Sequence, residues 1–162
     1  VPPDCWPVEV KCRRRMHCYL ADLQARRIEP GARALLLDAD GHVLEASSAN
    51  ICIFRRELGL VSPPKERILP GVSIAVIAEL ARALGIPFLH RDLTVDELLR
   101  ADEVLLCSTS PCVWPVLRLN GQTIGGGTPG EIFQSLLTAW SGLTGVNIQS
   151  QAERFAQRSA DW

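Results

Sequence analysis

Two charged side chains, a lysine and a glutamate, stand in contexts that suit chemistry. Lys11 ends a stretch, residues 6–11, that alternates in the manner of a strand. A lysine at a strand end beside a pocket can be desolvated, which disfavours its charged form and makes it a Schiff-base nucleophile. Glu45 ends an apolar run, and the small residues at 46–49 would let a ligand approach the backbone. Taken singly, each is more often a solvated surface charge.

Two loops have the composition of an anion-binding site. Residues 70–73, Pro-Gly-Val-Ser, stand where a helix is expected to begin, and free amides and the helix dipole favour negative charge there. Residues 108–110, Ser-Thr-Ser, follow an apolar run and offer hydroxyl groups. Both loops would suit a phosphate, although either pattern on its own is more often a plain turn or loop.

A hairpin is expected to carry Glu45. Apolar residues at 34–37 lead through an Asp-Gly turn into a second run at 42–44, which predicts a strand, a tight turn and a returning strand. Glu45 would then lie at the end of this hairpin, before a third strand that reaches Phe54. The run at 103–107 predicts a buried strand that ends at the hydroxyl-rich loop.

The rest of the chain mixes helices with short strands. Periodicity and end signals predict helices over 11–27, over 72–84 and from 131 to about Trp140, and Thr94 with Glu97 forms a capping signature for a short helix. The expected apolar positions of the second helix are Val72, Ala75, Val76, Ala78, Leu80 and Ala83. Further strands are expected at 60–61, 87–91, 113–119 and 122–124. Hairpins interleaved with helices indicate a mixed α/β or α+β domain.

Composition narrows the class of protein. The 17 Lys and Arg residues nearly balance the 18 Asp and Glu residues, so no basic bias suggests a nucleic acid partner. The basic run at 11–15 is interpreted as a solvated helix face. Six cysteines without a Cys-x-x-Cys pair, and three scattered histidines, indicate buried free thiols and no metal site. With no membrane-spanning stretch or signal peptide, the expected location is the cytoplasm, with no membrane partner.

Taken together and in order, these motifs resemble the fold-type-IV (class IV) pyridoxal-phosphate enzymes. That family comprises branched-chain aminotransferases, D-amino acid aminotransferases and aminodeoxychorismate lyases. The segments that carry the resemblance are Lys11, 45–50, 69–73, 101–104 and 108–110 with 115–116. It implies an α+β fold like the large domain of D-amino acid aminotransferases, with a mixed sheet or pseudo-barrel and flanking helices. Residues 1–140 would form this cofactor-binding domain, and 141–162 a polar C-terminal tail.

The resemblance also implies roles around pyridoxal 5'-phosphate. Lys11 would bind the cofactor covalently and move a proton at the substrate α-carbon. Glu45 would hold the proton on the pyridine nitrogen, because a neutral partner would not keep it there. Leu69 would pack on the ring face, and Asn50 would support the loop that carries Glu45.

The phosphate of the cofactor would lie between the two anion-binding loops. Gly71 belongs to the loop at the helix start, where Val72 and Ser73 would donate backbone amides. Ser73 would add its hydroxyl group, and Thr109 would supply another from the second loop.

Two departures from the family pattern shape the expectations. Family members carry a smaller domain of roughly a hundred residues before the lysine, and we expect it to be absent here. Branched-chain and D-amino acid members place a tyrosine five residues after the lysine, where this chain has Met16. Tyr19 lies three residues further on, and whether it substitutes is left open.

The resulting hypothesis is an aminotransferase that acts on an amino acid/2-oxo acid pair of the branched-chain or D-amino acid type. A 4-amino-4-deoxychorismate lyase-type enzyme is the first alternative, because both chemistries start with the same proton abstraction. A non-catalytic fragment or remnant of the fold is the second, and a plain α/β domain without a cofactor is the third. By resemblance, the protein is expected to be a homodimer.

Overall fold

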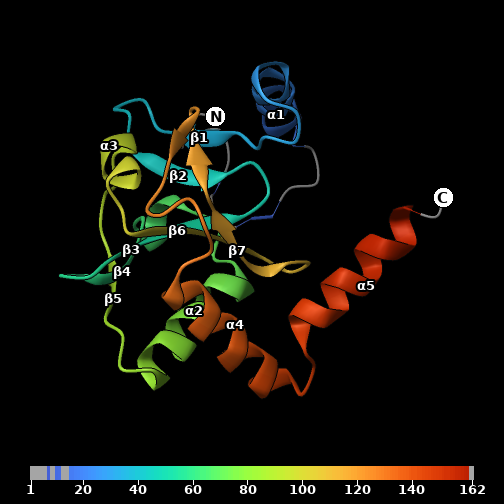
Figure 1. Ribbon diagram of the computed structural model, residues 1–162. Coiled ribbons are helices and arrows are strands. Elements are labelled where there is room, and N and C mark those ends of the chain that lie inside the picture. The colour runs from blue at the N-terminus through green and yellow to red at the C-terminus, as the bar shows by residue number, and fades with distance from the viewer. Residues whose placement is uncertain (1–6, 8–9, 12–14, 161–162) are drawn as a thin grey trace.

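A five-stranded mixed sheet forms the centre of the molecule (Figure 1). The computed structural model describes residues 7, 10–11 and 15–160, and the side chains up to 157. The strand order is β5-β4-β3-β6-β7. The bounds of these strands are β3 Asn50–Arg55, β4 Gly59–Ser62, β5 Phe88–His90, β6 Glu103–Ser108 and β7 Cys112–Val116. Because β5 and β7 are edge strands, this sheet is open and does not close into a barrel.

Two small hairpins accompany the main sheet. Strand β1 (Leu35–Leu37) pairs with β2 (Val43–Ala46), and β8 (Arg118–Leu119) pairs with β9 (Gln122–Thr123). Asn120 and Gly121 both have positive φ, 50° and 76°, as the tight turn between β8 and β9 requires. In the Asp-Gly turn between β1 and β2, Gly41 has a φ of 86° and its amide donates to the carbonyl oxygen of Asp38 at 3.2 Å. Both predicted hairpin turns are confirmed, although the expected strand at 113–119 is divided between β7 and β8.

Helices cover the sheet and extend from it. Their bounds are α1 Met16–Ile28, α2 Val72–Ala83, α3 Val95–Leu99, α4 Glu131–Thr144 and α5 Ile148–Ala160, with a 3-10 turn η2 at Lys65–Arg67. Thr94 and Glu97 form the predicted capping box of α3, with both reciprocal hydrogen bonds present. Helix α2 connects β4 to β5, which is why these two strands run parallel.

The central strand β3 is buried on both faces. Cys52 packs with Leu105 into a core that α2 and α4 cover, while Ile51 and Ile53 pack into a second core on the opposite face. This alternation follows from the two-residue period of a strand. The second core is completed by residues of the β1–β2 hairpin and of α3, among them Val43 and Leu98. Strand β3 is thus fixed from both sides.

The buried face of α2 differs from the sequence prediction. The structure buries Ser73, Ile74, Ile77, Leu80 and Ala81. Only Leu80 belongs to both sets, and Val72 is 78% exposed. Ile74, Ile77 and Ala81 form their own stripe at helical spacing, and the larger isoleucine side chains bury more apolar area against the sheet than alanines would.

The C-terminal region also differs from the prediction. Helix α4 continues past Trp140 to Thr144, where Gly145 ends it with a φ of 68°. Asn147 then accepts a hydrogen bond from the amide of Ser150 (2.9 Å), so a second helix, α5, occupies much of the expected tail. Figure 1 shows α5 projecting away from the sheet.

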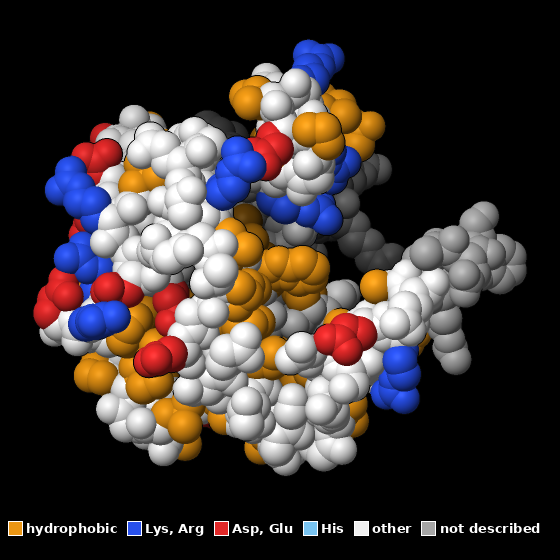
Figure 2. Space-filling view, in the orientation of Figure 1, with side chains coloured by type: hydrophobic (Ala, Val, Ile, Leu, Met, Phe, Trp, Pro, Cys, Tyr) orange, Lys and Arg blue, Asp and Glu red, His pale blue; other side chains and the backbone are white. Residues whose placement is uncertain are grey.

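The structure has an exposed apolar region and several buried thiols. Figure 2 shows apolar side chains gathered between α1 and the α4–α5 corner, and the neighbouring elements carry exposed Trp114, Leu143 and Phe155. Cys18, Cys52 and Cys107 are buried free thiols, as predicted. Cys112 is free but only half-buried, and Cys5 and Cys12 lie outside the described residues. Among the described residues, no helix is both long and apolar enough to cross a bilayer.

Candidate functional site

All eight residues that the sequence singled out line one open cleft of about 200 Å³. They are Lys11, Glu45, Asn50, Leu69, Gly71, Val72, Ser73 and Thr109. The remaining lining residues are Arg15, Ser48, Ala49, Pro70, Cys107 and Ser108. Segments separated by up to a hundred positions in the sequence therefore meet at one place.

Sheet pairing explains this convergence. Strand β2 ends at Ala46, directly after Glu45, and β3 begins at Asn50. Asn50 pairs in register with Cys107 of β6. The start of β3 and the end of β6 are therefore adjacent, and Thr109, just beyond β6, lies beside the loop that carries Glu45.

Asn50 joins Glu45 to the loop before α2. Its side-chain nitrogen donates to Glu45 Oε2 at 3.3 Å and to the carbonyl oxygen of Leu69 at 2.9 Å. The amide of Leu69 donates to the same Glu45 oxygen at 3.4 Å. Asn50 is 5% exposed, so these contacts are largely shielded from water. The carboxylate is held from two sides, by a side chain and by the backbone.

Burial dominates the electrostatics of Glu45. Desolvation raises the pKa of this carboxyl group, while the Leu69 amide and the positive charge of Arg15 act in the opposite direction. A desolvated carboxylate gains most from a cationic partner placed against it. This makes Glu45 suitable for holding a protonated ring nitrogen.

The start of α2 supplies an anion site to the same cleft. Gly71 is the N-cap residue, and Val72 and Ser73 occupy the first turn, which contains no acidic residue. The first amides of a helix have no partner within the helix and lie at the positive end of its dipole. A β-carbon at Gly71 would stand 2.1 Å from Asn50 Oδ1, so a side chain there would displace the amide that holds Glu45.

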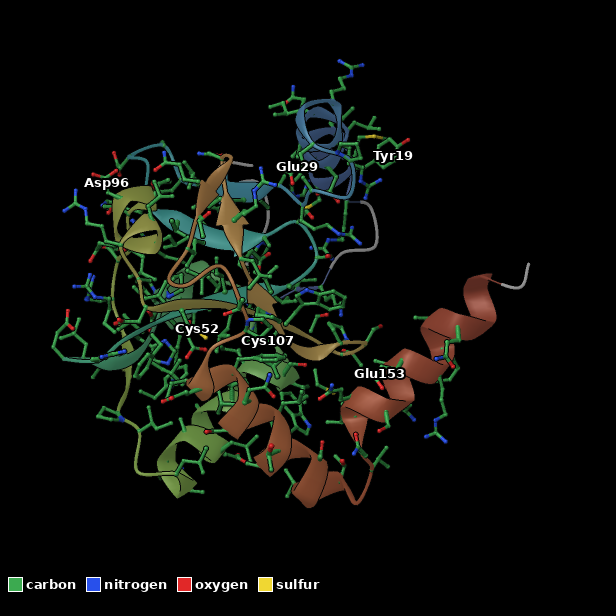
Figure 3. The ribbon with its side chains drawn as sticks, in the orientation of Figure 1. Tyr19, Glu29, Cys52, Asp96, Cys107 and Glu153 are labelled. Carbon is green, nitrogen blue, oxygen red and sulfur yellow. The ribbon has the colours of Figure 1, made fainter. Side chains whose placement is uncertain are left out.

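Met16 and Tyr19 follow Lys11 at the start of α1. Lys11 lines the cleft from its exposed rim. Met16 and Tyr19 are 65% and 57% exposed and do not line the cleft. Figure 3 shows Tyr19 on the outer side of α1, away from the sheet in which Cys52 and Cys107 lie. In this arrangement, the Tyr19 side chain lies outside the cleft.

Arg15 is a cleft residue that sequence reasoning missed. The basic run predicts a solvated helix face, but helix α1 begins only at Met16, and residues 12–14 are outside the described part of the chain. Arg15 is half-buried, and its Nη2 donates to the carbonyl oxygen of Ser47 at 2.5 Å. The available signal was its position four residues after Lys11.

The thiol of Cys107 also reaches the cleft, and it is inert. Burial raises the pKa of Cys107 to about 12 and raises that of Cys52 as well. Cys107 Sγ lies 3.7 Å from the carbonyl oxygen of Asn50. A thiol protonated at neutral pH contributes packing and no nucleophile.

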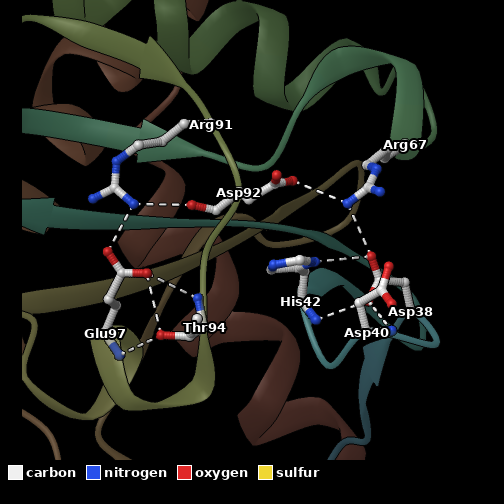
Figure 4. A network of polar contacts seen from close by, with 8 residues as sticks. All are labelled: Asp38, Asp40, His42, Arg67, Arg91, Asp92, Thr94 and Glu97. Carbon is white, nitrogen blue, oxygen red and sulfur yellow. Dashed lines mark hydrogen bonds and ion pairs between the residues drawn. The ribbon is translucent and has the colours of Figure 1, made fainter.

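A second polar cluster anchors the loop that leads to the cleft (Figure 4). Arg67 Nη1 lies 2.9 Å from Asp38 Oδ2 and 3.0 Å from Asp92 Oδ1. Asp38 also accepts the amides of Asp40 and His42. Desolvation raises the pKa of Asp38, but these hydrogen bonds and the nearby His42 lower it, so that the pKa lies below its ordinary value. Arg67 thereby fixes the segment just before residue 69.

Comparison with known families places the chain in one of them. The profile of the amino-transferase class IV family matches residues 1–119. The chain belongs to this family. As a class IV aminotransferase homologue, it shares the mixed α/β fold of the solved members.

Individual relatives agree with this assignment. The chain is 33% identical over 121 residues to the D-alanine aminotransferase of Bacillus licheniformis, covering 75% of this chain and 43% of the relative. It is 30% identical over 147 residues to a putative branched-chain-amino-acid aminotransferase of Methanocaldococcus jannaschii, covering 86% and 51%. The chain thus spans about half the length of these class IV relatives.

Solved class IV structures have the same fold. A branched-chain amino acid aminotransferase complexed with N-(5'-phosphopyridoxyl)-L-glutamate superimposes with a TM-score of 0.81 at 27% identity. The match covers 90% of this chain and 48% of the other. The branched-chain amino acid aminotransferase from Escherichia coli superimposes with a TM-score of 0.74 at 28% identity, covering 80% of this chain and 43% of the other.

Proposed function

We propose that this chain is the cofactor-binding large domain, residues 1–140, of a pyridoxal-phosphate-dependent aminotransferase. Its substrates would be an amino acid and a 2-oxo acid of the branched-chain or D-amino acid type. The observation that carries the proposal is the convergence of a lysine, a partly desolvated glutamate and a helix N-terminus on one cleft. Family membership supports the same activity.

The residues of the cleft suit the chemical groups of pyridoxal 5'-phosphate. Lys11 provides the amine that bonds the cofactor, and Glu45 provides the anion that holds the proton on its pyridine nitrogen. Leu69 provides an apolar contact for the ring, and Asn50 keeps Glu45 in place through the hydrogen bonds described above.

The phosphate group is assigned to the start of α2. The amides of Val72 and Ser73 lie at the positive end of the helix, and Ser73, which lines the cleft, would add its hydroxyl group. Thr109 provides a second hydroxyl group from the end of β6. Gly71 leaves room for the Asn50 side chain at this junction.

The cofactor and the residues of the chain would have different roles in the reaction. Bound pyridoxal phosphate supplies an electron sink for the negative charge that develops at the substrate α-carbon. Once released from the cofactor, the Lys11 amine would be the group that holds and moves the proton at the substrate α-carbon. Glu45 stays ionised, which favours the protonated ring nitrogen. The cleft residues would thus bind and orient the cofactor, and Lys11 would move one proton.

Cofactor attachment has a sharp test, because the sequence contains just two lysines, Lys11 and Lys65. The chain is mixed with pyridoxal phosphate, reduced with borohydride and digested for mass spectrometry. We expect one pyridoxyl group on the Lys11 peptide, with loss of the visible absorption band in Lys11→Ala. Lys65→Ala, on η2, is the matched control and keeps the band. Equal labelling of both lysines would overturn the assignment.

Turnover separates the alternatives. With branched-chain amino acids or D-alanine and a 2-oxo acid, an aminotransferase converts the absorption of the bound cofactor to that of the pyridoxamine form. A lyase releases product from aminodeoxychorismate without a 2-oxo acid. A non-catalytic remnant shows neither conversion, although it still binds the cofactor at Lys11.

We also propose that the protein is a homodimer in a reducing compartment, the cytoplasm. Exposed Trp114 and Leu143 supply apolar surface suited to a subunit interface. The buried thiols of Cys18, Cys52 and Cys107 suit a compartment that keeps cysteines reduced. Light scattering of the purified chain tests the dimer, and a monomer at micromolar concentration would contradict it.

A further inference from the structure

Arg15 stands where the chain enters α1, and it bridges two parts of the cleft. Its main-chain carbonyl accepts the amide of Tyr19 at 2.9 Å, which fixes it at the start of the helix. Its side chain reaches across 32 positions to the carbonyl oxygen of Ser47. Ser47 is buried in the turn that begins directly after Ala46, the last residue of β2 and the neighbour of Glu45. The contact therefore joins the N-terminal wall of the cleft to the loop that holds the carboxylate.

Few groups face Glu45 within the described residues. Asn50 and the amide of Leu69 contact the carboxylate and are neutral. The charged side chains that share the cleft are Lys11, at its exposed rim, and Arg15, which is half-buried. A guanidinium group stays protonated at any ordinary pH, whereas a lysine that becomes bonded through its amine loses its ammonium form. Among the residues that the structure describes, Arg15 is thus the permanent positive charge in this cleft.

We propose that Arg15 is a positioning residue of this site. It pins the turn after Glu45 through the Ser47 carbonyl, and its charge favours the ionised form of Glu45 before any ligand enters. The carboxylate is then ready to accept a protonated ring nitrogen, a consequence that rests on the function proposed above. The effect on Glu45 itself does not depend on that function.

The charge effect can be measured on the chain without cofactor. Glutamate labelled with ¹³C at the side-chain carboxyl group is incorporated, and the Glu45 signal is assigned by its loss in Glu45→Gln. The carboxyl titration is then followed by NMR. Arg15→Gln should move the Glu45 midpoint upward, because the positive charge of Arg15 favours the ionised carboxylate and the variant removes that charge.

Two further variants separate charge from structure. Arg15→Lys keeps the positive charge and should leave the midpoint close to that of the wild type. Arg26→Gln, on α1, removes an arginine that pairs with Asp22 at 3.5 Å and does not line the cleft. It should leave the midpoint unchanged. A shift of equal size in Arg26→Gln, or none in Arg15→Gln, would overturn the proposal.

A measurement on the wild-type chain covers the case in which Arg15→Gln fails to fold. Raising the salt concentration from about 0.01 M to about 1 M shortens the Debye length from about 30 Å to about 3 Å. The Glu45 midpoint should therefore rise with salt, and an unchanged midpoint would contradict the proposal. Absence of cofactor binding with a normal salt response would reject the aminotransferase assignment and leave the role of Arg15 intact.

Discussion

Asn50 Oδ1 lies 2.1 Å from the point where a β-carbon on Gly71 would stand. Two segments, the start of β3 and the cap of α2, are therefore in contact without room for one more carbon atom. The amide in this contact also holds Glu45 and Leu69. The geometry of the carboxylate and that of the anion site are thus coupled through a single residue.

Gly71→Ala should weaken both parts of the site. The new methyl group displaces the Asn50 amide and costs about 1–3 kcal/mol of unfolding free energy, as overpacking does. Cofactor affinity should fall tenfold or more, because about 1.4 kcal/mol corresponds to each factor of ten. Urea unfolding and a binding titration measure the two effects. Gly142→Ala, where nothing lies within 4 Å of the new carbon, is the control and should be neutral or stabilising. Wild-type stability in Gly71→Ala would refute the coupling.

Glu45→Gln should have opposite effects on stability and on cofactor binding. Burial raises the pKa of Glu45 in the folded chain, so its ionisation disfavours folding. Glu45 therefore contributes most to the stability of the folded chain below its pKa in the unfolded chain. This contribution is lost as the pH rises through its pKa in the folded chain. Without cofactor, the stability of Glu45→Gln relative to wild type should therefore increase as the pH is raised through this range. Cofactor affinity should fall about tenfold to a hundredfold, the loss of one charged hydrogen bond. Thermal unfolding from pH 4 to pH 8 checks the first effect, and a flat difference would contradict it.

Arg67→Ala should loosen the segment before the anion loop. Both ion pairs of Arg67 are partly exposed, so we expect a loss of about 0.5–1 kcal/mol that shrinks in about 1 M salt. Chemical denaturation at low and high salt measures it. Arg100→Ala, which removes an exposed pair with Asp96, is the matched control and should cost less. An equal loss in both variants would mean that Arg67 has no anchoring role.

Asp22→Asn should release α1 from the segment before β1. Asp22 is buried, accepts the amide of Ala34 at 2.9 Å and pairs with Arg33 at 3.2 Å. Despite opposing desolvation, these contacts lower the pKa of Asp22 from 3.8. The stability from its charge is therefore present above pH 3.8 and lost as the pH falls through the folded value. Asp22→Asn should cost about 1 kcal/mol at pH 7 and less in acid. Denaturation at both pH values measures this, with Asp96→Asn as an exposed control.

The residues that line the cleft could largely be predicted because their sequence signals are local. A lysine after an alternating run, a glutamate before small residues and Pro-Gly at a helix start each follow from backbone and charge requirements. The capping box at Thr94 was equally clear, since both of its partners lie within one turn. Such features depend little on how distant parts of the chain pack.

The features that the sequence did not predict depend on distant packing. The apolar residues of α2 permit two buried stripes, and only the shape of the sheet beneath favours that of Ile74 and Ile77. Arg15 belongs to a run of three arginines in the sequence, and its contact with Ser47, 32 positions away, cannot be read from that run. Helix α5 is hard to predict because its cap at Asn147 closely follows a glycine and precedes a polar segment.

The two sides of the cleft differ in how they are attached. Asn50 belongs to β3, which is packed on both faces, so amide hydrogen exchange there should require opening of the whole domain. Helix α1 buries Cys18 and Asp22 alone among its 13 residues, and ion pairs such as Arg118–Glu29 help to join it to the body. Exchange in α1 should therefore occur by local detachment, sensitive to salt. A molecule bound to both Lys11 and Glu45 would link the two sides of the cleft. It would therefore slow amide hydrogen exchange in α1 far more than in β3.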